Sequence, residues 1–294
     1  MSYIDSFENH LKNEKRYSIH TVTAYVNDIK QFFAFMKSQY QSDSVSEVSG
    51  TIVKSWIYEL SKDKINPRSI NRKLVAMNTF FKFLIISEVV TVNPLKSVKG
   101  PKTEKRLVEW LPEKNTVDLF SAITWDDDFS GLRDRLIFEL LYGTGMRLSE
   151  LITLSKSRIY IPKKTLKVIG KRNKERIIPM NKALMETLEK YLKARADMGF
   201  EAEELLLLTD NGKPLYPVFV QRLTKKYLSI LSSAKKLSPH VLRHTFATHL
   251  LNKGADINAI KELLGHANLA ATQVYTHNSI ERLKQIYKQA HPKS

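Results

Sequence analysis

The sequence predicts a mainly helical protein with one small β-sheet, divided into two domains. Apolar residues recur at three- and four-residue spacing along most of the chain, which is the period of amphipathic helices. Two short β-rich runs, 165–169 and 176–178, flank a basic turn in the second half. The segment 96–107 combines glycine, proline and alternating charges without an apolar period, as linkers do. We therefore expect a helical domain at 1–98, a basic linker at 99–107 and an α+β domain at 108–294.

The composition favours a folded protein with a polyanionic partner. The 294 residues are 43% hydrophobic, enough for two modest cores, and the formal net charge is +17. Lysines and arginines bind nucleic-acid phosphates, and their spread over both halves argues against a single membrane-binding amphipathic helix. The chain has no cysteine, which excludes disulfides and thiol catalysis. It has no signal-like or membrane-spanning apolar run, so we expect a cytoplasmic protein.

Three helices are predicted in the first domain, at 18–40, at 51–62 and from Asn66-Pro67 onward. Their aromatic residues lie in the apolar stripes, so they are expected to pack in the core and not to stack on bases. The other face of the third helix is basic and is interpreted as a phosphate-binding face, although a solvated helix face explains the same residues. The candidates on this face are Arg68, Arg72 and Lys73.

The second domain is predicted to combine helices with short strands. The hairpin tip at 170–175 is basic, so it could enter a groove, or it could be a charged edge that resists aggregation. The C-terminal helix is amphipathic and needs a surface in its own chain or in a neighbouring one. Predicted helices span 112–124, 134–142, 182–198, 218–231, 239–252, 257–264 and 279–289, and a further strand spans 205–208.

Chemically active side chains are concentrated toward the C-terminal end of the sequence. Ser238-Pro239 is a typical helix start, which puts His240 and Arg243 on one face near the positive end of the helix dipole. Such a helix end binds anions. His266 and Tyr275 follow. A phosphate clamp beside a tyrosine hydroxyl is what attack on a phosphodiester needs.

Arg147 follows the glycine-rich break Gly143-Thr144-Gly145, and Glu150 comes three residues later. A carboxylate at that spacing can hold the guanidinium in place. Taken alone, such an arginine is more often a surface residue, and a lone tyrosine is more often packed. Zinc is a further interpretation of the histidines, but cysteine and the HExxH pattern are absent, so no metal is predicted. The histidines in question are His240, His244, His249 and His266.

Four motifs in order resemble those of the tyrosine recombinases, also called the phage-integrase family. GTGMRLSEL, from Gly143 to Leu151, is similar to the box of the first arginine, and HVLRH, from His240 to His244, to the His-x-x-Arg box. Leu264-Gly265-His266, with Tyr275 nine residues after the histidine, is similar to the box of the final histidine and the nucleophile. The hairpin from Gly170 to Pro179 is similar to the lysine hairpin of the family.

The resemblance covers nearly the whole chain and is greatest to the Xer subgroup. One departure is Arg172, where this hairpin commonly has glycine. The departure bears on the choice of Lys171 over Lys174, and the family pattern favours Lys171. Besides the length, the Xer-like positions are Ser18, Thr21, Tyr25 and Asp28 in the first helix and Asn93-Pro94 before the linker.

The resemblance implies an N-terminal SAM-like core-binding domain and a catalytic tyrosine-recombinase domain, which together form a C-shaped clamp on DNA. It implies that Tyr275 attacks a phosphodiester and forms a 3′-phosphotyrosine, with no metal or other cofactor. The two arginines would grip the phosphate and the lysine would protonate the leaving 5′-oxygen. The implied catalytic set is Arg147, Lys171, His240, Arg243, His266 and Tyr275, with Glu150 orienting the first arginine and Arg172 on the DNA.

The implied partners are a specific duplex site, a homo- or hetero-tetramer on two sites and, for the Xer subgroup, an FtsK-type DNA translocase. The implied role is resolution of chromosome dimers before cell division. The same chemistry also suits an integrase or transposase of a mobile element, or a type IB topoisomerase. A non-catalytic DNA-binding protein on this fold is the alternative of another class, and the intact catalytic set argues against it.

Overall fold

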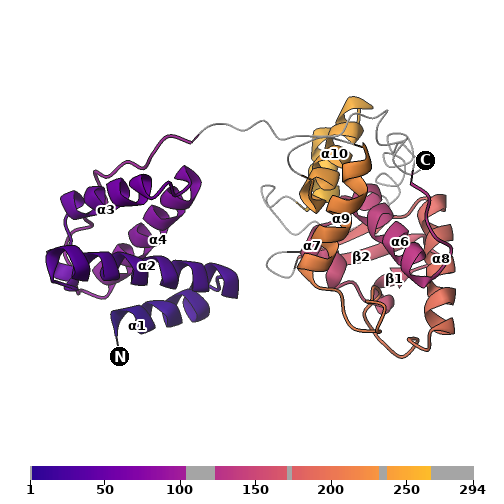
Figure 1. The fold of residues 1–294 in the computed structure, drawn as a ribbon, viewed down its shortest axis with the longest axis horizontal. Helices are drawn as coiled ribbons and strands as arrows, with labels where there is room; N and C mark the ends of the chain where they lie inside the picture. Colours follow the sequence, from indigo (N-terminus) through magenta and orange to yellow (C-terminus); the bar gives the residue numbers. More distant parts are fainter. Residues whose placement is uncertain (1, 104–122, 171–173, 232–236, 266–294) are drawn as a thin grey trace. The chain divides into compact units, whose positions relative to one another are not determined.

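The computed structural model describes residues 2–103, 123–170, 174–231 and 237–265, which belong to two compact units, Met1–Arg106 and Leu107–Ser294 (Figure 1). Each unit is mainly helical and has its own apolar core, and the second contains one small sheet, which confirms the predicted fold class. No helix in the described ranges is long and apolar enough to cross a membrane. Four predicted site residues and the predicted C-terminal helix lie outside the described residues. These residues are Lys171, Arg172, His266 and Tyr275.

The N-terminal unit is built from helices that begin at side-chain caps. The residues Ser18, Ser49 and Asn66 each accept a hydrogen bond from a backbone N–H in the first turn of the helix that follows. A first helix and a π-helical turn precede the predicted ones, and their apolar residues pack on the same core. The elements are α1 (Tyr3–Asn9), η1 (His10–Glu14), α2 (Ile19–Tyr40), η2 (Val45–Glu47), α3 (Gly50–Lys62) and α4 (Pro67–Ile86).

Aromatic rings fill the core of this unit, as the helical periodicity predicts. Phe32 of α2 lies edge-on to Trp56 of α3, with ring centroids 5.1 Å apart. Phe80 of α4 meets Phe7 of α1 in the same way, also at 5.1 Å. All four rings are buried, so they hold the helices together and are not free to stack on bases.

Lys73 does not belong to the predicted phosphate-binding face, because its side chain is buried. Only 8% of this side chain is exposed, and its ammonium donates to Asp28 at 2.8 Å and to Gln31. It also lies 6.0 Å from the ring centroid of Trp56. A buried ammonium needs such compensation, so Lys73 is a structural residue of the α2–α4 interface. Arg72 also bonds Asp28, but 44% of its side chain remains exposed.

The C-terminal unit packs helices around α6 and places a three-stranded sheet beside them. Helix α6 lies between α8 and α10 in Figure 1 and packs on both. It begins five residues before the predicted start, where the Asp128 carboxylate accepts from the N–H of Gly131. The elements are α6 (Phe129–Thr144), α7 (Leu148–Ile152), η3 (Lys156–Arg158), β1 (Ile159–Tyr160), β2 (Thr165–Ile169), β3 (Glu175–Pro179), α8 (Lys182–Asp197), α9 (Pro217–Leu231), α10 (Pro239–Asn252) and α11 (Ile257–Leu264). The sheet is antiparallel in the order β1-β2-β3.

The predicted strand at 205–208 is wrong. This segment makes only isolated bridges, one between Ser155 and Leu205 and one between Leu208 and Pro214. The buried Arg195 guanidinium donates to several carbonyls of residues 200–206, so side-chain donors satisfy this backbone and no β-ladder forms. The predicted helix at 112–124 lies mostly outside the described residues, and its described end, 123–124, is not helical.

Candidate active site

The turn after α6 brings Arg147 against α10 and α11. Gly145 has φ +61°, the left-handed conformation that favours glycine, and its N–H bonds the Leu141 carbonyl to end the helix. A Cβ at Gly145 would lie 2.5 Å from the Phe246 ring and 2.8 Å from the Leu264 side chain. Only glycine therefore lets the chain turn this close to the two later helices, and Arg147 follows as the N-cap residue of α7.

The buried Glu150 carboxylate is the centre of a cluster of charges. The residue is 3% exposed, and four donors reach its two oxygens. Arg147 supplies its backbone N–H and its Nη1, each at 2.8 Å. Arg176 of β3 supplies Nη1 at 2.8 Å and Nη2 at 2.7 Å as a bidentate pair. An ionised carboxylate accepts about four hydrogen bonds, so this group is satisfied without water.

Three successive carbonyls at the end of α11 accept from three different arginines. The last carbonyls of a helix have no partner within it, and they form the negative end of its dipole. Cationic side chains are therefore stabilised there. The Leu263 carbonyl accepts from Arg176 Nε at 2.7 Å, the Leu264 carbonyl from Arg243 Nη2 at 2.6 Å, and the Gly265 carbonyl from Arg147 Nη2 at 3.0 Å. Arg243 Nη1 also donates to the Gly145 carbonyl, so α6, α10 and α11 meet at this point.

Positive charges outnumber negative charges in this cluster. Arg147, Arg176 and Arg243 are three cations, and Glu150 is the carboxylate that Arg147 and Arg176 bond among the described residues. Burial, with the charges of Arg147 and Arg176, lowers the pKa of Arg243 to about 10, while Glu150 opposes this shift. Arg243 remains protonated at neutral pH. The side chain of Arg147 is 25% exposed, so the excess positive charge can reach an anion from solvent.

The pKa of Glu150 is set by two opposing causes. Burial raises it, but hydrogen bonding to Arg176 and the charge of that guanidinium, followed by the bonds from Arg147, lower it from 4.5 to about 2. Because the folded-state pKa is lowered, the ionised carboxylate stabilises the folded protein. This contribution is complete above the unfolded-state pKa of 4.5 and is lost as the pH falls toward about 2.

We therefore expect Glu150→Gln to remove part of the acid sensitivity of the C-terminal unit. The wild type should lose on the order of 3 kcal/mol from this group between pH 4.5 and pH 2, and the variant should lack that slope. The measurement is urea unfolding at a series of acidic pH values. Glu189→Gln, at an exposed position of α8, is the control and should keep the wild-type slope. Equal slopes for wild type and Glu150→Gln would contradict the prediction.

The histidines of α10 occupy different environments. His240 is exposed in the first turn, one turn before Arg243. His249 is fully buried, and its Nδ1 lies 3.0 Å from the Tyr142 hydroxyl, so it is a packed core histidine. Ser238 is the N-cap residue, as predicted, but its side chain makes no capping hydrogen bond within the described part of the chain. Across the described ranges, no group of three histidines or acidic residues could hold a metal ion.

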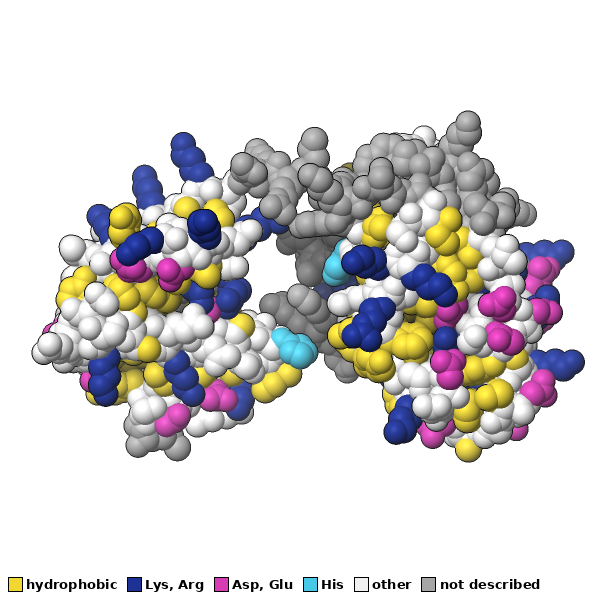
Figure 2. Space-filling model, in the orientation of Figure 1, with side chains coloured by type: hydrophobic (Ala, Val, Ile, Leu, Met, Phe, Trp, Pro, Cys, Tyr) yellow, Lys and Arg dark blue, Asp and Glu magenta, His cyan; other side chains and the backbone are white. Residues whose placement is uncertain are grey.

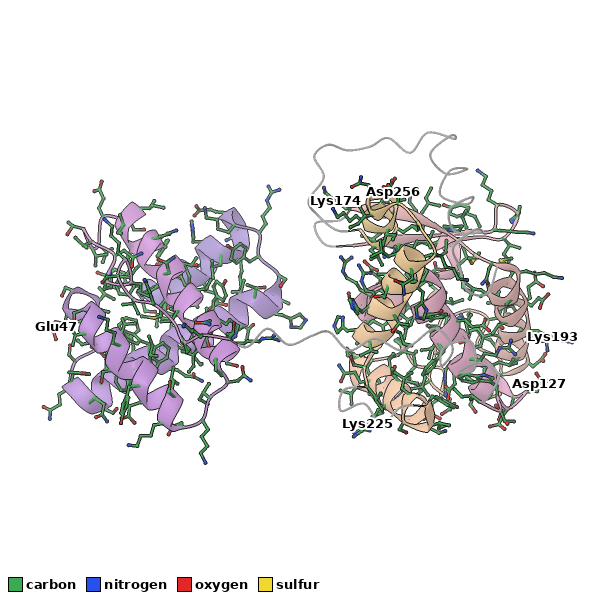
Figure 3. All side chains as sticks on the ribbon, turned by 90° about the horizontal axis from the view of Figure 1, so that it is seen from above. Glu47, Asp127, Lys174, Lys193, Lys225 and Asp256 are labelled. Carbon is green, nitrogen blue, oxygen red and sulfur yellow. The ribbon has the colours of Figure 1, made fainter. Side chains whose placement is uncertain are left out.

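Arg176 is the member of this cluster that the sequence reasoning missed. The sequence motif placed it in the hairpin but assigned it no partner. The sequence pattern that could have identified Arg176 is its spacing of two residues from Ile178, because residues two apart in a strand share one face. In the structure Ile178 is fully buried. An arginine on a core face needs a buried partner, and Glu150 is that partner. Figure 3 shows Lys174, just before β3, and Asp256, which caps α11, at the same edge of the unit, in agreement with the packing of α11 on β3.

Comparison with known proteins identifies relatives of nearly the same length. Residues 109–282 match the phage integrase family, and residues 4–88 match the phage integrase N-terminal SAM-like domain. The chain is 36% identical to tyrosine recombinase XerC of Chlorobaculum parvum, over 99% of this chain and 94% of that protein. It is 38% identical to tyrosine recombinase XerC of Pelobacter propionicus, over 100% and 96%. Its fold is similar to that of the XerH site-specific recombinase bound to a palindromic difH substrate, with TM-score 0.73, 19% identity and coverage of 96% and 83%.

Proposed function

Because the chain belongs to the phage integrase family and is a site-specific tyrosine recombinase, we propose that it cuts and rejoins DNA strands through a covalent bond to Tyr275. The observation that carries this proposal is the arginine cluster. Arg147 and Arg243 converge from α7 and α10 on one end of α11, with a charge excess that a phosphodiester would neutralise. Preorganised donors of this kind stabilise the charge of a pentacoordinate phosphorus.

The proposed step forms one bond and breaks one. The Tyr275 oxygen attacks phosphorus, the bond from phosphorus to the 5′-oxygen breaks, and Lys171 gives that oxygen a proton. A phenol has a pKa of about 10, so His240 would assist removal of its proton. His266 would donate a hydrogen bond to the phosphate. The bond energy is kept in the phosphotyrosine, so the reverse attack by a 5′-hydroxyl rejoins a strand.

Two glycines support the proposed places of the residues that the structure does not describe. Gly170 comes directly before Lys171, and a Cβ added to it would lie 3.3 Å from Glu150 Oε1. Gly265 comes directly before His266, and its carbonyl already bonds Arg147. Both undescribed residues therefore continue from backbone that touches the arginine cluster, which favours their participation in the same site.

Duplex DNA is the proposed partner, and phosphates would supply most of the affinity. Figure 2 shows lysine and arginine side chains on the visible surface of each unit, interspersed with acidic ones. Arg68 is exposed at the start of α4 and Arg72 is partly exposed, so both remain candidates, together with Arg172 of the hairpin tip. We further propose a tetramer on two sites, with the C-terminal helix docked on a neighbouring protomer, and activation by an FtsK-type translocase in the cytoplasm. The curated relatives named XerC favour chromosome-dimer resolution as the role.

The test is the formation of a covalent adduct on a suicide duplex. The duplex should come from the chromosome terminus region of the source organism and carry a nick near the cleavage point, so that religation is lost. We expect an SDS-resistant adduct whose DNA-linked peptide contains Tyr275, and none with a duplex of scrambled sequence. Tight binding without an adduct, or an adduct on another residue, would contradict the proposal. Cleavage confined to the ends of a mobile element would instead favour the role of an integrase.

Arg147→Lys should slow adduct formation far more than it weakens DNA binding. Lysine keeps the positive charge but cannot bond Glu150, Gly265 and a phosphate with one planar fork. Removing one preorganised donor costs about 10²- to 10³-fold in rate. Single-turnover adduct formation at saturating duplex measures the effect. Arg222→Lys, on the exposed face of α9, is the control and should react at the wild-type rate. Equal rates for the two variants would exclude Arg147 from the proposed role.

A further inference from the structure

Arg176 holds two parts of the site without being available to the substrate. Arg176 is 4% exposed, and three of its nitrogens already donate hydrogen bonds within the protein. Nη1 and Nη2 bond the two oxygens of Glu150, and Nε bonds the carbonyl of Leu263. The Arg176 side chain, which comes from β3, thus joins the first turn of α7 to the last turn of α11.

The position of Arg147 depends on the charge state of Glu150. Ionised Glu150 accepts from both the backbone N–H and the Nη1 of Arg147, which fixes the plane of that guanidinium. Without Arg176, two of the four acceptor sites of this buried carboxylate would lose their donors. Burial would then favour the protonated form, which has an O–H in place of one acceptor site.

The end of α11 depends on the same side chain. Arg176 bonds the first of three successive carbonyls, and Arg243 and Arg147 bond the next two. Consecutive carbonyls of one helix turn move together, so a shift of Leu263 would change the anchor points of both other arginines. Gly265 also packs on Arg176, because a Cβ there would lie 3.2 Å from Nη1. The Arg176 guanidinium therefore supports the two carbonyls to which Arg243 and Arg147 donate.

We propose that Arg176 is a positioning residue for strand cleavage, which fixes the Arg147 guanidinium through Glu150 and the carbonyl end of α11 without touching the scissile phosphate. This inference rests on the proposed function only in that the positioned guanidinium is taken to act in strand cleavage. The positioning itself is a property of the protein without DNA. The charged groups that face Glu150 in the described structure are Arg147 at the start of α7, Arg176 of β3 and, more distantly, Arg243 of α10.

The first arm of the test needs no DNA. Phenylglyoxal modifies free guanidinium groups, and peptide mass spectrometry measures the rate at Arg147 against the exposed Arg68 as an internal reference. We expect Arg176→Met to accelerate modification of Arg147 several-fold. Arg195→Met is the matched control, because Arg195 is 1% exposed and its hydrogen bonds within the described part of the chain go to backbone carbonyls of residues 200–206. Equal Arg147 reactivity in the two variants would overturn the proposal.

The second arm measures cleavage of the suicide duplex at saturating DNA. We expect Arg176→Met to slow adduct formation roughly 10- to 100-fold, as outer supports of a site do, with little change in DNA affinity. Its rate should also rise more steeply with pH than the wild-type rate does, as Glu150 regains its charge, and Glu150→Gln in the same background should remove this additional rise. Arg176→Lys, which keeps the charge without the fork, guards against a fold defect and should recover only part of the rate.

The two arms separate the failure of this inference from failure of the proposed function. A wild type that forms no adduct would contradict the function, while the reactivity of Arg147 would still decide the positioning. A wild-type adduct together with an Arg176→Met rate equal to that of Arg195→Met, or with an unchanged pH profile, would overturn the inference alone.

Discussion

Tyr275→Phe is expected to abolish the covalent adduct and to leave duplex affinity nearly unchanged. Phenylalanine keeps the ring and removes the hydroxyl that would attack phosphorus, so no phosphotyrosine can form. Loss of a nucleophile lowers turnover on the order of 10⁶-fold in well-studied enzymes, which puts residual activity below detection. Affinity should persist, because it depends mainly on basic side chains that contact phosphates. Gel electrophoresis in SDS and a shift assay measure the two quantities on one duplex.

The matched control is Tyr160→Phe. Tyr160 is a 45% exposed tyrosine of β1 in the same unit, and its hydroxyl is not part of the arginine cluster. This variant should form the adduct at the wild-type level. An adduct that persists in Tyr275→Phe would show that another residue is the nucleophile, and the mechanism would then fail at its central step.

Asp28→Asn is expected to destabilise the N-terminal unit by about 3–5 kcal/mol. Asp28 is 2% exposed, and it compensates the buried ammonium of Lys73 as well as part of Arg72. Asparagine keeps the shape but leaves the ammonium without a counter-charge, and breaking a buried pair from one side is far more costly than replacing both partners. Urea unfolding followed by the fluorescence of Trp56 measures the effect, once Trp110 and Trp125 are replaced by phenylalanine.

Two further variants make this prediction specific. Asp43→Asn, at an exposed loop position of the same unit, should leave the free energy of unfolding unchanged. The double variant Asp28→Leu with Lys73→Met removes both buried charges and should recover much of the lost stability. A small effect of Asp28→Asn, equal to that of Asp43→Asn, would mean that Lys73 finds solvent or another partner, and that it could then reach a phosphate.

The sequence by itself determined the features that depend on neighbouring residues. The helix starts at Asn66 and Asp256 follow from the sequence, and both side chains accept a backbone hydrogen bond from the first turn. The predicted cap Ser238 makes no such bond within the described residues. The β2–β3 hairpin follows from two short β-rich runs around a turn. The pair of Arg147 and Glu150 is local as well, because Arg147 is the N-cap residue of α7 and Glu150 is the third residue of that helix. The order of the four motifs was sufficient to identify the family.

Only the tertiary structure decided which charges are buried and what they hold. Lys73 lies on a basic face in the sequence, yet Asp28, 45 residues earlier, draws it into the interior. The run at 205–208 looks like a strand, yet the Arg195 guanidinium donates hydrogen bonds to two of its carbonyls. Arg176 reaches Leu263 across 87 residues. In each case the partner is distant in the chain, and the free energy of a buried charge depends on that partner more than on its own neighbours.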